Sequence, residues 1–169
     1  MRRLIYLLGA ALAAGTFAAP AALADDPPAT PFPGKTADAF IYVDTVNGSR
    51  PKGAAPRPIG CTQINYFKRG EQLVFRVWGT ETATGDPLST ANVKYAYVKV
   101  PGLPNMKLNW GPHGAASNRV WFWTAAWDIP ADYSLGTVAY RVVFKTESNK
   151  FGVFKQTGLP TTAQLTITP

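Results

Sequence analysis

Apolar residues recur at every second position along several short stretches of the chain, which is the period of a β-strand with one buried face. The clearest stretch is 71–78, where Leu73, Phe75 and Val77 hold alternate positions. The segment before it, 65–70, ends in a glycine and is predicted to be a turn. The pattern predicts a half-buried strand over 71–78.

Other stretches rich in β-branched and aromatic residues are separated by turn signals such as Asn47-Gly48 and Pro101-Gly102. No window combines a helical period with capping residues. The further predicted strands cover residues 39–46, 93–100, 105–110, 120–129, 137–146, 150–154 and 164–168. About seven short strands without helices predict an all-β fold, an antiparallel sandwich.

The stretch 120–129 is apolar on both faces of its predicted strand. Side chains alternate between the two faces of a strand. One face would carry Val120, Phe122, Thr124 and Ala126, and the other Trp121, Trp123, Ala125 and Trp127. Both faces must therefore meet something apolar.

Two arrangements are open for these indoles. If Val120 and Phe122 face the core, then Trp121, Trp123 and Trp127 form an outward row, which Trp110 and Trp78 could extend. Such a row can stack on sugar rings or form the hot spot of a protein interface, because Trp offers a large contact area for little entropy loss. In the other arrangement the segment 101–119 covers the row, since exposed apolar patches are uncommon in monomers.

The N-terminus has the features of a secretory signal. Arg2 and Arg3 precede an uncharged apolar run, 4–19, and Ala22 and Ala24 provide the small side chains that a signal peptidase requires. The run is shorter than the roughly 20 apolar residues of a membrane span. We expect cleavage after Ala24, a secreted or periplasmic location, and no membrane insertion of the mature chain.

The mature part is predicted to be one domain preceded by a leader. Residues 25–37 carry four prolines and are expected to form an extended, Pro-rich leader, and 38–169 the sandwich domain. Without its first 24 residues the 169-residue chain keeps 15 Lys and Arg against 10 Asp and Glu, a net charge of +5. These cations are scattered rather than clustered with aromatic residues, so nucleic acid is not an expected partner.

Several sequence elements resemble those of bacterial immunoglobulin-like domains, over roughly residues 65–168. They are Gly70-Glu71, Thr84-Gly85-Asp86-Pro87-Leu88, Ala91-Asn92-Val93, Pro130, Gly136 and Tyr140. The resemblance implies an antiparallel sandwich of the immunoglobulin-like kind and a non-catalytic domain that binds, spaces or presents another molecule. A fainter similarity to small periplasmic immunoglobulin-like domains of copper and respiratory proteins rests on Pro101–Met106, which here contains a single methionine.

Metal and redox chemistry have few candidate residues. The soft or borderline ligands of the mature chain are Cys61, Met106 and His113, too few for a blue-copper centre or a closed zinc site. A low-coordinate copper site from these three is one alternative. A free Cys61 is another redox candidate, although an unpaired cysteine is more often buried as a small hydrophobe. We expect no cofactor.

Catalytic residues are not indicated either. His113 is the sole histidine, so Cys61 and His113 form the one candidate nucleophile and base pair, and neither lies in a protease signature. The sequence therefore predicts an exported, non-enzymatic binding or accessory domain that contacts a protein partner through its aromatic strand. A carbohydrate-binding module using the same tryptophans and a copper or redox accessory protein using Cys61 are the alternatives.

Overall fold

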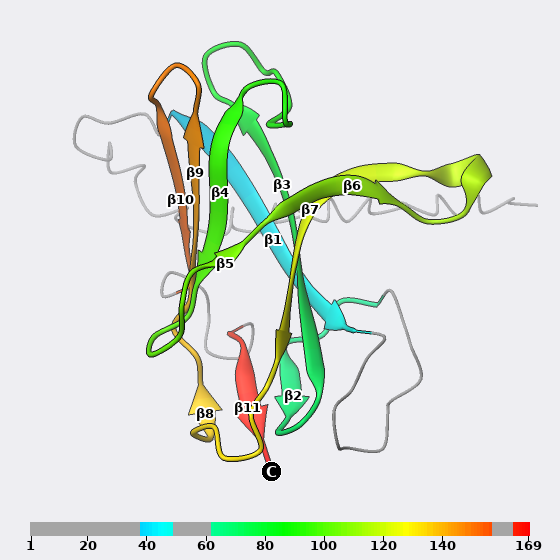
Figure 1. Cartoon of the computed structure of the whole chain (residues 1–169), viewed down its shortest axis with the longest axis vertical. Helices are drawn as coiled ribbons and strands as arrows, with labels where there is room; N and C mark the ends of the chain where they lie inside the picture. The colour runs from blue at the N-terminus through cyan, green and yellow to red at the C-terminus, as the bar shows by residue number, and fades with distance from the viewer. Residues whose placement is uncertain (1–37, 49–61, 157–163) are drawn as a thin grey trace, which may run out of the picture. The chain divides into compact units, whose positions relative to one another are not determined.

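The computed structural model describes residues 38–48, 62–156 and 164–169, and these residues are all β (Figure 1). They belong to the compact unit Thr36–Pro169. The predicted signal peptide and leader, and Cys61, lie outside the described residues. Within the described part there is no α-helix, and one short 3-10 helix, η1, covers Ala116–Asn118.

The strands form three sheets. The first sheet has the order β1 (Ala39–Asn47), β3 (Gln72–Glu81), β7 (Val120–Asp128) and β6 (Asn109–His113), and all its pairs are antiparallel. The second sheet, also antiparallel, has the order β10 (Phe151–Lys155), β9 (Arg141–Thr146), β4 (Val93–Lys99) and β5 (Met106–Lys107). The third sheet places β11 (Thr166–Thr168) between β2 (Tyr66–Lys68), its parallel neighbour, and β8 (Gly136–Thr137).

One hydrophobic core joins the first and second sheets. From β3 it takes Leu73, Phe75 and Val77, which are fully buried at the alternate positions that the sequence pattern predicts. From the second sheet it takes Val142 and Phe144, which are fully buried as well. Burying each such side chain contributes about 1.5–3 kcal/mol, and the all-β sandwich architecture expected from the sequence is confirmed.

The chain changes sheets between β5 and β6. Strand β5 pairs with β4 in the second sheet, whereas β6 pairs with β7 in the first, and only the buried Leu108 separates β5 from β6. Figure 1 shows that the hairpin formed by β6 and β7 then extends away from the second sheet. Its far end, with η1, is exposed. This projecting end of the hairpin, residues 110–121, is called the arm below.

Two predicted elements differ in detail. The predicted strand 137–146 is interrupted, because the backbone N–H of Val138 donates to the carbonyl of Leu165 and so holds β8 in the third sheet, while β9 continues in the second. The predicted turn 65–70 contains β2, whose pairing partner β11 lies about a hundred residues later in the chain. Partners so distant in sequence leave no local signal.

Candidate functional site

Trp123 and Trp127 lie in the core and not on an outer row. In the register of the first sheet Trp123 is opposite Val77 and Trp127 is opposite Leu73, so the indoles share the inward face of β3. Each is only 5% exposed. Of the two arrangements that the sequence leaves open, the one in which Val120 and Phe122 face the core and Trp123 and Trp127 point outward is therefore wrong.

Specific contacts hold both indoles inside. The Trp123 Nε1–H donates to the backbone carbonyl of Leu88 at 2.8 Å, and its ring meets Phe144 edge-on at 5.5 Å between centroids. Trp127 meets Tyr133 in the same edge-on way at 4.9 Å. The hydrogen bond satisfies the polar group of the buried Trp123, and both rings fill space in the core.

Trp121 and Trp110 continue this face of β7 and β6 out along the arm. Trp110 is half-buried and lies between the two other indoles, 5.4 Å from Trp123 and 5.9 Å from Trp121. Trp121 is 51% exposed, and its neighbour Val120 is 53% exposed. Of the three indoles in the possible outward row, Trp121 alone is exposed. A chain of three indoles thus runs from the core to the surface of the arm.

A second aromatic feature was missed by the sequence reasoning except for Trp78. On the outer face of the first sheet, rings from all four strands follow one another across the sheet, at centroid distances of 5.8, 4.8 and 4.0 Å. They are Tyr42 of β1, Trp78 of β3, Phe122 of β7 and His113 of β6. We call this set the outer aromatic row. Its signal was the position of Trp78 in the same strand as Leu73, Phe75 and Val77 but at the opposite parity.

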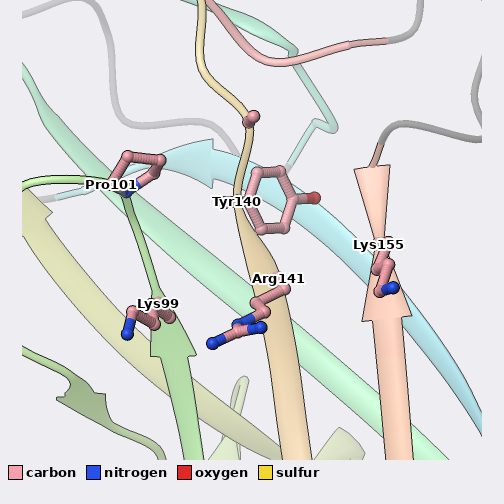
Figure 2. A pocket seen from close by; sticks show the side chains of 6 residues that line it. Lys99, Pro101, Tyr140, Arg141 and Lys155 are labelled. Atoms are coloured by element: carbon pink, nitrogen blue, oxygen red, sulfur yellow. The ribbon is translucent and has the colours of Figure 1, made fainter.

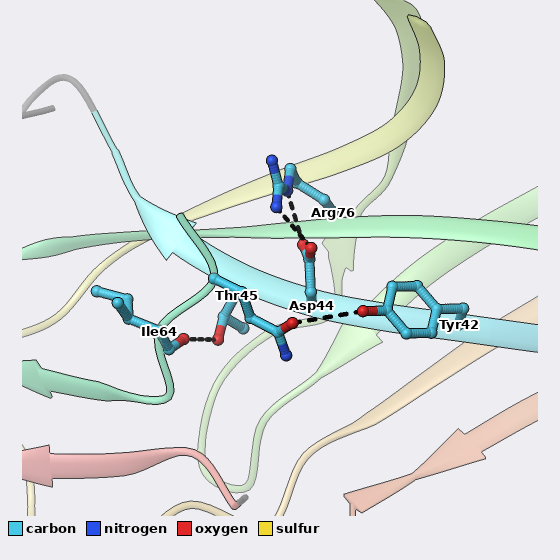
Figure 3. A network of polar contacts seen from close by, with 6 residues as sticks. Tyr42, Asp44, Thr45, Ile64 and Arg76 are labelled. Carbon is cyan, nitrogen blue, oxygen red and sulfur yellow. Dashed lines mark hydrogen bonds and ion pairs between the residues drawn. The ribbon is translucent and has the colours of Figure 1, made fainter. Parts of the chain in front are cut away.

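An ion pair lies beside the outer aromatic row (Figure 3). The Arg76 guanidinium donates to both carboxylate oxygens of Asp44, with Nε to Oδ1 at 2.7 Å and Nη2 to Oδ2 at 2.5 Å, and it lies 5.8 Å from the centre of the Trp78 ring. The Asp44 side chain is 7% exposed. Such a two-bonded pair is geometrically specific, and it leaves this part of the face without net charge.

Further polar contacts in Figure 3 tie β1 to the following segment. The Tyr42 hydroxyl donates to Gln63 Oε1 at 3.4 Å, and the Thr45 hydroxyl donates to the backbone carbonyl of Ile64. The backbone N–H of Ile64 donates in return to the Thr45 carbonyl at 2.9 Å. These hydrogen bonds attach β1, the edge strand of the first sheet, to Gln63 and Ile64.

His113 is a neutral aromatic member of this row. Its ring stacks on Phe122, with planes 14° apart. Desolvation by burial, and secondarily the positive charge of Arg76, lower the pKa of His113 below its ordinary value of 6.5. The imidazole is therefore uncharged at neutral pH and packs as an aromatic ring.

The proposed copper ligands are not brought together in the described part of the chain. Met106 lies in β5 and packs against the core, whereas His113 ends β6. Seven residue steps through two strands separate them, so the strand rise places their α-carbons on the order of 20 Å apart. Among the described residues no group of three or more His, Cys, Asp or Glu could hold a metal ion.

Comparison of the chain with protein-family models, with curated proteins and with solved structures finds no match. In the described residues no helix has both the length and the apolar character needed to cross a membrane. The candidate site consists of the arm, with Trp121, Trp110 and Val120, and the adjoining outer aromatic row.

Proposed function

We propose that this chain is an exported, non-catalytic binding domain of the bacterial immunoglobulin-like kind that contacts a protein partner through the arm. The observation that supports it best is the half-exposed indole of Trp121 at the far end of a hairpin that leaves the sandwich. Trp is the residue most enriched at the energetic centre of protein interfaces.

The arm is arranged so that binding costs little entropy. Trp121 packs on Trp110, which packs on the buried Trp123, so the exposed ring is supported from behind. A side chain that is already held in one position loses little freedom when a partner covers it. An anchor of this kind therefore keeps most of its contact energy as affinity.

The chemistry of the arm fits an apolar groove in another protein. From Asn109 to Thr124 the sole formally charged residue is Arg119, and Val120 adds an exposed aliphatic surface beside Trp121. The interface core of a protein complex is similarly depleted in charge and rich in aromatic side chains.

A carbohydrate partner is favoured less by the ring geometry. A row of sugars is best met by ring faces that are open and lie nearly in one plane. Here Trp110 and Trp121 are inclined by 31°, and in the outer aromatic row Trp78 is inclined by 47° to the rings on both sides. Because these rings are inclined to one another, they do not form a single flat platform for a row of sugars.

Site-specific photo-crosslinking in the producing cell tests this proposal. A photoreactive phenylalanine analogue replaces Val120 on the arm or, as the matched control, Leu135, which is equally exposed at 50% but lies in the turn before β8. We expect one discrete protein adduct from position 120, none from position 135, and loss of the adduct when Trp121→Ala is added. An adduct that survives Trp121→Ala, or no adduct from position 120, would overturn the proposal.

Carbohydrate binding is tested in parallel. The intrinsic tryptophan fluorescence of the full chain is titrated with a panel of soluble polysaccharides, and we expect no change. A saturable change that Trp121→Ala abolishes would replace the protein partner with a sugar.

A further inference from the structure

Three cations stand directly opposite one another on the outer face of the second sheet. Lys99 of β4 is the register partner of Arg141 of β9, and Arg141 is the register partner of Lys155 of β10. All three are exposed (Figure 2). Like charges at directly opposite positions repel and destabilise a sheet, so this row costs stability in the absence of a compensating anion.

The cation row borders a concave site. A pocket of about 350 Å³ is lined by the three cations and by Pro101, Ala139 and Tyr140. Figure 2 shows Lys99, Arg141 and Lys155 on neighbouring strands below the ring of Tyr140, with the guanidinium of Arg141 turned toward Lys99. Strands lie about 4.8 Å apart, so the row spans roughly 10 Å.

No carboxylate balances these charges within the described second sheet. The outward positions of β4, β9 and β10 follow from the register and contain no acidic residue; they are Tyr95, Tyr97, Lys99, Arg141, Val143, Lys145, Phe151, Val153 and Lys155. Among the described residues, no carboxylate forms an ion pair with Lys99, Arg141 or Lys155.

We propose that this pocket binds a compact, soluble anion that carries phosphate groups. A guanidinium recognises phosphate through two parallel hydrogen bonds, and lysine adds a mobile positive charge. A single carboxylate would neutralise one of the three cations, whereas a diphosphate or a phosphate with a second anionic group matches the row. The pocket volume lies within the range of small-molecule sites.

Tyr140 borders this pocket, but its side chain is buried in the core, where its ring packs against Phe75 and Phe154. Burial, and secondarily the nearby charge of Asp44, raise the pKa of Tyr140 above its ordinary value of 10. The phenol therefore stays protonated at neutral pH, so it introduces no negative charge that would repel an anion.

The same strand supplies a matched control. Lys145 lies four residues after Arg141 on the same face, and its ammonium is held over the rings of Phe151 and Tyr95 at 5.1 and 5.9 Å. Four residues of strand correspond to roughly 13 Å, more than the Debye length of about 10 Å at 0.1 M salt. Lys145→Gln therefore removes an equal charge without altering the pocket.

Calorimetric titration of the full chain with inorganic pyrophosphate at 0.1 M salt tests the proposal. We expect one saturable site, affinity at least tenfold weaker for Arg141→Gln, and less than a threefold change for Lys145→Gln. Absence of binding to the wild-type chain would overturn the proposal. Equal weakening by both variants would also overturn it, because it would indicate a general charge effect.

Thermal unfolding distinguishes an anion-binding role of Arg141 from a structural role. Vesicle binding distinguishes a soluble anion from a membrane surface as the ligand. Without ligand, Arg141→Gln should melt at or above the wild-type temperature, since it removes like-charge repulsion, and pyrophosphate should raise the melting temperature of the wild type but not of the variant. A large loss of stability in Arg141→Gln would contradict this account. Binding to phosphatidylglycerol vesicles without binding of pyrophosphate would also contradict it. These measurements concern the second sheet, so their outcome does not depend on whether the arm binds a protein partner.

Discussion

The indole nitrogen of Trp123 donates a hydrogen bond to the backbone carbonyl of Leu88, 2.8 Å away, and this contact joins the middle of β7 to the loop after β3. Leu88 is itself 1% exposed, and its backbone N–H donates to the Gly79 carbonyl at 2.8 Å. The bond therefore belongs to the buried interior, and it shows that this tryptophan contributes to folding.

We predict that Trp123→Ala lowers the free energy of unfolding by about 3–5 kcal/mol, the usual cost of removing a large buried aromatic side chain. Trp123→Phe should cost less, about 1–3 kcal/mol, because the ring is largely kept while the Leu88 carbonyl loses its partner. Urea denaturation followed by circular dichroism measures both. If Trp123→Ala unfolds at the wild-type urea concentration, the placement of this indole is wrong.

The positions of the strands could be predicted from the sequence, but which face of β7 points into the core could not. Each predicted stretch contains an observed strand because the alternation and the turn residues are local signals. Strand 120–128 is apolar on both sides, so its own pattern does not distinguish the inward face. The decision comes from its neighbour: pairing with β3 places Trp123 beside Val77 and Trp127 beside Leu73.

A glycine sets the closest approach of the two sheets at one edge. A Cβ on Gly152 of β10 would lie 2.8 Å from Ile41 Cδ1 and 2.9 Å from the Ala39 Cβ of β1. We predict that Gly152→Ala destabilises the domain by about 1–3 kcal/mol through overpacking. The control is Gly111→Ala, because a Cβ at Gly111 meets nothing within 4 Å. Equal urea midpoints for the two variants would show that this edge is not closed by β10.

The pair of Asp44 and Arg76 should show strong energetic coupling. Removing one partner leaves a charge with little access to water, so Asp44→Asn or Arg76→Gln alone is expected to cost about 3 kcal/mol. The double variant should cost clearly less than the sum of the two. A double-mutant cycle of unfolding free energies measures this coupling, and strict additivity would indicate that the two side chains act independently.

Acidification should weaken the outer aromatic row through His113, the single histidine of the chain. The folded-state pKa of His113 is lowered, mainly by burial and then by Arg76, so its contribution to stability is fully present above the ordinary value of 6.5 and is lost as the pH falls through the folded pKa. We predict that the urea midpoint of the wild type falls between pH 7 and pH 5. His113→Gln should lack that part of the decrease. Identical pH profiles would contradict this effect.

The two surface features that were missed share a physical reason. The outer aromatic row and the cation row are both made by residues that lie far apart in the sequence and become neighbours only through strand register, as for Lys99 and Arg141. Along the chain each of these residues is an ordinary outward position on its own strand. The exposure of Trp121 and the burial of Trp123 likewise could not be decided from the sequence, which left an exposed and a covered arrangement open.

The most direct test of the account is the affinity of the crosslinked protein partner for variants of the arm. We predict that Trp121→Ala unfolds within about 1 kcal/mol of the wild type, as is usual for exposed positions. Its dissociation constant should rise by roughly 30-fold or more, as expected for an interface hot spot worth at least about 2 kcal/mol, while Leu135→Ala binds as the wild type does. A dissociation constant that Trp121→Ala leaves unchanged would contradict the arm as the binding surface.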